Sequence, residues 1–172
     1  MKIKEIVIKS KIKALCGKPR RKAFMELKDV QRIALLFDAE NYDQAIAFKH
    51  ELESMGKKVR AWSYAEVAMP EWEYLPSQWL LTRKHLNFCY LPKQYIVDDY
   101  QGYPADMLLF LSLRKNLVME YFSLLSPAPF RVSFNTARAK EYDFVLAPLS
   151  ESGGLKENAE SLLFYLKNLR LK

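Results

Sequence analysis

The chain has 172 residues, of which half are apolar and 27% are charged, with only 5 glycines. This balance excludes disordered and fibrous proteins, because those chains carry too few apolar side chains or a glycine-rich period. The length is typical of one domain with a single core. Cys16 and Cys89 belong to no CxxC or Cys/His pattern, so the sequence excludes a structural zinc site and indicates free thiols in a reduced compartment.

The net charge of +7 is concentrated near the start of the chain. Residues 1–32 hold 11 Lys/Arg against 3 Asp/Glu, whereas the other 140 residues hold 16 against 17. We therefore predict a basic N-terminal helical arm over 1–28 and a single α/β domain over 29–172. A basic arm attracts anions, so its expected partner is RNA, a ribonucleoprotein, an anionic membrane surface or an acidic protein. The chain contains no DNA-binding motif.

The first 22 residues contain no recognisable targeting or membrane segment. Their longest apolar run is Ile6–Ile8, whereas the core of a signal peptide needs ~7–15 residues and a membrane span ~18. We therefore expect no transmembrane segment, and a cytoplasmic protein that keeps its N-terminus.

A helix is predicted over about 2–15, because Gly17 and Pro19 would end it. Its apolar residues form no single stripe, which argues against a helix lying on a membrane. They fall into two groups, first Ile3, Val7 and Ala14, and second Ile8, Ile12 and Cys16. The densest basic cluster follows this helix and is the candidate anion-binding site: Lys18, Arg20, Arg21 and Lys22. It either contacts phosphates, which needs no fixed fold, or belongs to a solvated or loosely packed surface.

The segment 32–41 is the centre of the predicted fold. Five apolar residues in a row, Ile33–Phe37, are too few for a helix and suit a strand buried on both faces of a parallel sheet. Asp38 and Glu40 follow directly. Asn41 is expected to cap the next helix, with Gln44 completing a capping box.

A strand–helix–strand unit follows from this start. One apolar helical stripe is formed by Ala45, Phe48, Leu52 and Met55. Gly56 is expected to end this helix, and the alternation over 58–64 predicts a second strand. Two strands joined by a helix pair in parallel with a right-handed crossover.

Residues 66–103 are predicted to form long loops, with one short strand at 86–90. The span 62–103 contains 10 of the 23 aromatic residues, among them Trp72, Tyr74 and Trp79. Long loops are uncommon unless they are used, so one hypothesis is a protein-interaction module. The alternative is that these rings cover an edge of the sheet, with their hydroxyls in water.

The C-terminal part predicts strands at 107–111, 130–134 and 144–147 and helices at 114–125 and 155–169. Only about eight residues join the last two strands, too few for a helical crossover, so they pair antiparallel or lie apart. The fold class expected is three-layer α/β, with a mostly parallel or mixed Rossmann/flavodoxin-like sheet, helices on both faces and a basic N-terminal helix.

In a doubly wound strand order such as 3-2-1-4-5, strands 33–37 and 107–111 are neighbours at the switch point. The residues that follow them would then face one candidate crevice: Asp38, Glu40, Asn41, Ser112 and Arg114. No catalytic residue, metal or cofactor is expected, and the favoured function is non-catalytic.

Other possible sites carry weak signals. His50 and His85 have no suitably spaced catalytic partner and are expected at the surface. Ser150–Gly154 lacks the phosphate-binding glycine signatures and reads as a plain turn. Asp98-Asp99 in a loop is a very weak cation signal.

The chain resembles a family of small uncharacterised proteins from Bacteroidetes. The resemblance rests on the Lys-rich N-terminal helix, on Ile33–Ala39, on Phe130–Ser133, on Tyr142–Leu146 and on a last helix from Leu155. None of these motifs is catalytic, and the family has no assigned activity, so the resemblance implies a fold. Ser133 stands where the family pattern has Gly, so no role of that glycine can be carried over.

Phe37–Asn41 resembles the "DAEN" motif of NYN-type ribonuclease domains, relatives of the PIN fold. That resemblance implies that Asp38 helps to hold a divalent metal for phosphodiester cleavage. Such domains carry further acids, and here only Asp106 is a candidate. If Asp106 opens strand 107–111, it lies ~15–20 Å from Asp38, at the opposite end of the sheet. This separation counts against a shared metal site. A divergent metal-dependent ribonuclease remains the enzyme alternative because of the motif at Asp38.

Overall fold

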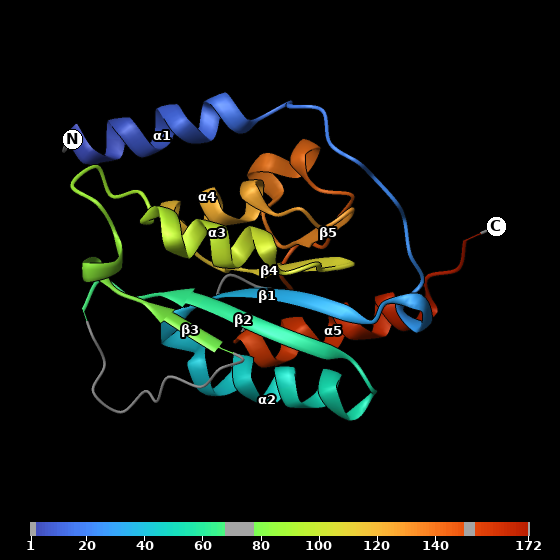
Figure 1. Ribbon diagram of the computed structural model, residues 1–172. Coiled ribbons are helices and arrows are strands. Elements are labelled where there is room, and N and C mark those ends of the chain that lie inside the picture. Colours follow the sequence, from blue (N-terminus) through green and yellow to red (C-terminus); the bar gives the residue numbers. More distant parts are fainter. Residues whose placement is uncertain (1–2, 68–77, 150–153, 172) are drawn as a thin grey trace.

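The computed structural model describes residues 3–67, 78–149 and 154–171, which form an α/β fold around one parallel sheet (Figure 1). The six strands lie in the order β3-β2-β1-β4-β5-β6, and all neighbouring strands are parallel. The strands are β1 Arg32–Asp38, β2 Lys58–Tyr64, β3 Gln78–Leu81, β4 Met107–Leu111, β5 Phe130–Ser133 and β6 Phe144–Val145. The helices are α1 Ile3–Leu15, α2 Tyr42–Ser54, α3 Gln94–Gly102, α4 Leu117–Leu125 and α5 Leu155–Asn168. The predicted three-layer fold class is confirmed.

Strand β1 separates two hydrophobic cores. Ile33, Leu35 and Phe37 face α2 and α5, whereas Ala34 and Leu36 face α3 and α4. This alternation follows from the two-residue period of a strand, and burial of both faces explains the uninterrupted apolar run in the sequence.

Helix α1 packs on the outer side of α4 and so adds a partial fourth layer (Figure 1). Only Ile8 and Ile12 are buried among its residues, at 2% and 0% exposure. The chain then runs along the end of the sheet, where the Ala23 N–H donates to the Pro129 carbonyl at 3.0 Å. The boundary predicted near residue 28 stays a prediction, but α1 contributes directly to the core.

The expectation that the last two strands pair antiparallel or lie apart is wrong. Val132 pairs with Phe144 in a parallel register, and a 3-10 helix at Thr136–Glu141 joins the two strands. This connection is kinked at Arg138, so it is two short 3-10 turns and not one straight helix. A short connection suffices because the two strands have only four and two residues.

The predicted loop at 91–104 is largely helix α3, and the strand expected at 86–90 is absent from this described segment. Helix α3 has an apolar face made by Ile96, Val97 and Tyr100, which the polar residues between them obscure in the sequence. The Tyr100 ring meets the buried Trp62 ring edge-on at 5.0 Å, so these aromatics belong to the core. Trp79 is half-buried in the same core.

Trp72 and Tyr74 lie outside the described residues. So does most of the turn predicted at Ser150–Gly154, of which Gly154 precedes α5 and donates its N–H to Glu157. The two aspartates of the weak cation signal lie on α3 instead of a loop. Asp98 accepts a hydrogen bond from Gln94, and Asp99 pairs with Arg60.

Two local predictions are wrong. His85 is buried and not at the surface. Its Nδ1 atom accepts a hydrogen bond from the Thr82 backbone N–H at 2.9 Å, and this bond caps a short 3-10 turn. Asn41 makes no side-chain cap on α2 among the described contacts. The Gln44 side chain instead accepts from the Lys156 N–H of α5, so a tertiary contact replaces the predicted capping box. His50 is exposed, as predicted.

No helix in the described part of the chain is long and apolar enough to cross a membrane. Helix α5 has 14 residues, whereas a membrane-spanning helix needs ~20.

Candidate functional site

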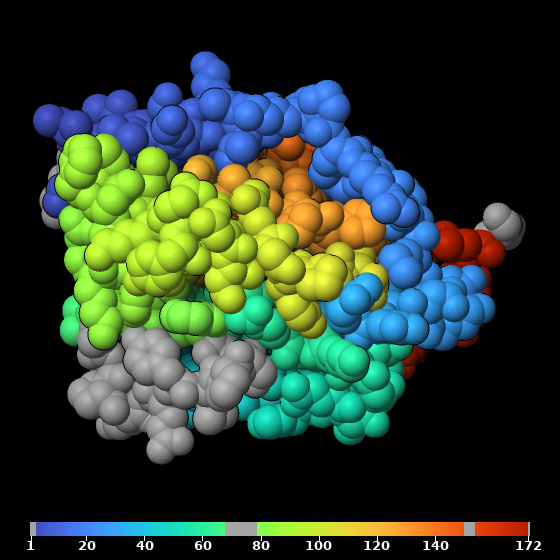
Figure 2. Space-filling view, viewed as in Figure 1, coloured from blue at the N-terminus to red at the C-terminus, as the bar shows by residue number. Residues whose placement is uncertain are grey.

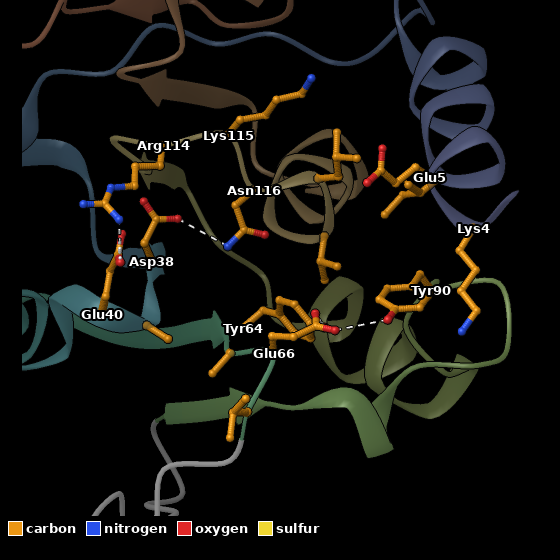
Figure 3. Close-up of a pocket in the computed structure, with 16 residues that line it drawn as sticks. Lys4, Glu5, Asp38, Glu40, Tyr64, Glu66, Tyr90, Arg114, Lys115 and Asn116 are labelled. Carbon is orange, nitrogen blue, oxygen red and sulfur yellow. Dashed lines mark hydrogen bonds and ion pairs between the residues drawn. The ribbon is translucent and has the colours of Figure 1, made fainter. Parts of the chain in front are cut away.

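A pocket of about 600 Å³ lies at the carboxyl ends of β1, β2 and β4, next to the N-terminal ends of α1 and α4 (Figure 3). Strand β1 leads to α2 on one face of the sheet, and its neighbour β4 leads to α4 on the other. In open parallel sheets, ligands bind at such a switch point. The pocket therefore lies where the sequence places its candidate crevice.

Asp38 ends β1 and is only 4% exposed. Its Oδ1 atom accepts hydrogen bonds from Ser112 Oγ at 2.7 Å and Asn116 Nδ2 at 3.3 Å, and Oδ2 accepts from the Leu113 N–H at 3.0 Å. Burial raises the pKa of this carboxyl above its ordinary value, while these donors and the Arg114 N–H lower it. The carboxylate thus holds the loop after β4 against the end of β1.

Four of the five residues predicted for the crevice lie close to one another. Ser112 contacts Asp38, and Arg114 Nη1 lies 2.9 Å from Glu40 Oε2 in an exposed ion pair. Asp38, Glu40 and Arg114 line the pocket, whereas Ser112 and Asn41 are not among the described residues that line it. An exposed ion pair contributes at most ~1 kcal/mol, so Arg114 and Glu40 can separate at little cost to meet a ligand.

The opposite wall of the pocket contains a carboxylate held by two tyrosines, which sequence reasoning missed (Figure 3). Tyr64 ends β2, and its hydroxyl donates to Glu66 at 2.8 Å, while the Tyr90 hydroxyl donates to Glu66 at 3.1 Å. Burial and the Glu66 charge both raise the pKa of Tyr64, so this hydroxyl remains a donor. Because 24 positions separate Glu66 and Tyr90, no local pattern indicates this contact.

Tyr90 lies in a strained turn at this wall. Its φ of +63° is in the left-handed region, which residues other than glycine rarely adopt. The Asn87 Oδ1 atom accepts from the N–H groups of Cys89 and Leu91 and so holds the turn. The Lys4 ammonium of α1 lies 4.8 Å from the centre of the Tyr90 ring, which brings α1 to the pocket.

The described residues do not assemble a divalent-metal site, since no three His, Cys, Asp or Glu side chains among them lie close enough together. Asp106 accepts hydrogen bonds from the N–H groups of Gln31 and Arg32, at the amino end of β1. Asp38 lies at the carboxyl end of the same strand, ~20 Å away for seven residues. Asp106 is therefore too far from Asp38 to bind the same metal. The sequence predicts this separation.

The predicted anion-binding residues differ in their surroundings. Arg20 is half-buried, pairs with Asp143 at 2.6 Å and donates to the Pro129 carbonyl, so it serves the fold. Lys18, Arg21 and Lys22 are exposed, and none of them takes part in an ion pair in the described structure.

A family model described as a family of unknown function, DUF6913, matches residues 4–169. This match confirms the resemblance to an uncharacterised family, whereas an origin in Bacteroidetes and a likeness to NYN-type ribonucleases stay predictions. No curated protein and no solved structure matches the chain. The match covers both walls of the pocket and nearly the whole sheet and its helices, so the chain belongs to the DUF6913 family of unknown function.

Proposed function

We propose that this protein is a non-catalytic binding module that attaches to an anionic partner through the cationic surface of its N-terminal segment. One observation carries the proposal. Five cationic side chains of this segment are exposed and take part in no ion pair that the structure describes: Lys11, Lys13, Lys18, Arg21 and Lys22. Glu5 is the only acid among residues 1–25, so little in this segment offsets their charge.

The test replaces these five residues with Gln and measures binding to single-stranded RNA and to vesicles containing phosphatidylglycerol. We expect the unmodified protein to bind one of these probes, and to bind it far more weakly at about 200 mM salt than at about 50 mM, because counterion release drives such binding. The variant should lose this binding. A control with Lys156→Gln and Lys167→Gln, exposed on α5 beyond the sheet, should behave as the unmodified protein. Equal binding by all three proteins would contradict the proposal.

The two alternative functions have less support among the described residues. In the ribonuclease hypothesis Asp38 would ligate a metal, yet neutral protein donors already occupy both of its oxygens. In the interaction-module hypothesis the segment 66–103 would present free rings; Tyr100 is buried and Trp79 is half-buried, whereas Phe88 and Tyr95 are exposed.

As a second proposal, the crevice takes a small ligand, and its position at the switch point is the observation in favour. The probe is anilinonaphthalene sulfonate, a dye with an apolar body and one negative charge. We expect its fluorescence to rise on binding, and Ala65→Trp, which places a large ring in the pocket, to abolish that rise. A matched change outside the pocket, Ala47→Trp at an exposed position of α2, should leave it unchanged. A fluorescence rise that is unchanged in Ala65→Trp would mean that the dye does not bind in this pocket.

A further inference from the structure

The two apolar groups of the N-terminal helix prove to be two separate faces of α1. Ile8 and Ile12 point into the core, where they contact the side chains of α4. At ~100° per residue, Ile3 lies on the opposite side, about 180° from Ile12. Ile3 is 79% exposed and Ile6 is 48% exposed. An apolar face of α1 therefore points away from the protein, and Figure 2 shows this helix lying on the outside of the molecule.

Small residues continue the outward face along the helix. Taking Ile3 as the centre, Ser10 and Ala14 lie within about 20° of it and Val7 within about 40°. Ser10 and Ala14 are exposed and Val7 is half-buried. None of these four residues is charged, so the outward face runs the length of α1 without an ionic group.

Lysines border this face on both sides. Lys11 and Lys13 lie about 80° to either side of Ile3 on the helix. Both are exposed, and neither takes part in an ion pair among the described residues. Glu5, the only acid of α1, lies on the inward half and pairs with Lys9. Long lysine side chains can keep their ammonium groups in the polar layer while apolar neighbours enter the lipid.

A further exposed apolar residue belongs to the turn beside the start of α1. Tyr90 contacts the ammonium group of Lys4, so the turn that contains Tyr90 lies next to the first turn of the helix (Figure 3). Phe88, in the same turn, is 82% exposed. The turn next to the start of α1 therefore also exposes an apolar side chain.

We propose that the anionic partner is the surface of a lipid bilayer, with α1 lying in its interface. This proposal rests on the proposed function and names its partner. An apolar face bordered by lysines is the arrangement that binds anionic lipid, because the apolar residues enter the acyl boundary and the cations meet the headgroups. RNA would use the same lysines, but it offers nothing to cover Ile3 and Ile6.

The test uses the full chain and a variant, Ile3→Ser with Ile6→Ser, which keeps every charge. Cosedimentation is measured with neutral phosphatidylcholine vesicles, with vesicles that also contain phosphatidylglycerol, and, by anisotropy, with single-stranded RNA. The matched control is Phe164→Ser with Tyr165→Ser, an exposed pair on α5 on the other side of the sheet. Because all four residues are between 48% and 79% exposed, both variants should keep the melting temperature of the unmodified protein.

We expect binding to the anionic vesicles and not to the neutral ones. The Ile3→Ser, Ile6→Ser variant should bind at least about tenfold more weakly, because two isoleucines that enter the lipid in the bound state are replaced by polar groups. The α5 control should bind as the unmodified protein. Salt-sensitive RNA binding without vesicle binding, or vesicle binding that ignores the isoleucines, would overturn this proposal and leave the proposed function standing. Binding to neither probe would overturn both.

Discussion

Asp38 is the residue on which the shape of the candidate crevice depends. Both of its oxygens accept hydrogen bonds from the loop after β4. In Asp38→Asn, an NH2 group replaces one of the two oxygens and cannot accept a hydrogen bond. Depending on which oxygen is replaced, either the Leu113 N–H or the Ser112 and Asn116 side chains lose their acceptor. We expect the free energy of unfolding to fall by about 1–3 kcal/mol, the cost of an unsatisfied buried polar group. Urea denaturation measures it, and Asp29→Asn at an exposed site should change it by less than about 0.5 kcal/mol.

Arg20 and Arg21 are neighbours with opposite predicted roles. Arg20→Gln leaves the buried Asp143 carboxylate without its cation, so we expect a loss of about 1–3 kcal/mol in the free energy of unfolding. Arg21→Gln should leave stability unchanged and weaken binding to anionic vesicles about fivefold, as one cation near the surface is lost. Denaturation and cosedimentation of both variants test the pair. The reverse pattern would mean that the Arg20–Asp143 contact does not hold the segment to the sheet.

His85 should make stability depend on pH. Burial first, and then Lys84 and Lys93, lower its pKa below the ordinary value of 6.5, so the folded state disfavours the charged ring. The unfolded chain takes up a proton near pH 6.5, whereas the folded protein does so only at lower pH. The His85 contribution is therefore fully present above pH 6.5 and is lost as the pH falls below it.

Denaturation at several pH values between about 5 and 8 measures this contribution. His85→Gln keeps an acceptor for the Thr82 N–H but does not titrate, so its stability should fall less with decreasing pH than that of the unmodified protein. His50→Gln, at an exposed position, should retain the pH dependence of the unmodified protein. Identical pH profiles for all three proteins would contradict the assignment.

At the scale of elements, α1 has two faces with different tasks. Ile12→Ala should lower the free energy of unfolding by about 2–4 kcal/mol, because a fully buried side chain leaves a cavity against α4. Ile6→Ala, on the outward face, should cost less than about 0.5 kcal/mol. Thermal and urea denaturation of the two variants make the comparison. Equal and small effects would mean that residues 1–28 are a loose arm, separate from the domain that follows.

Elements with a strong apolar period were predictable, and elements defined by short or mixed segments were not. The uninterrupted run of β1 and the stripe of α2 each indicate their structure locally. Helix α3 was missed because Asp98 and Asp99 interrupt its apolar residues in the sequence, although they lie on the solvent side of the helix. Strand β6 has only two residues, and its direction depends on a 3-10 connection whose length the sequence does not reveal.

At the scale of the whole molecule, the sequence predicts the position of the pocket and one of its walls, but not the opposite wall. The switch point follows from strand order, so the wall that contains Asp38, Glu40 and Arg114 could be anticipated from strand ends alone. The other wall depends on tertiary contacts that bring Glu66 to Tyr90 and α1 to both. The two apolar groups of α1 were visible in the sequence, but only packing on α4 shows which one remains free.

We propose that the outward face of α1 is the surface that meets an anionic partner. The most direct measurement attaches an environment-sensitive NBD dye at Ile6→Cys, with Cys16 and Cys89 replaced by alanine, and records its emission as anionic vesicles are added. We expect the emission to rise and shift to the blue at position 6, because the dye enters the lipid interface. The same dye at Tyr165→Cys on α5 should not respond. A response at position 165 and none at position 6 would mean that α1 does not meet the membrane.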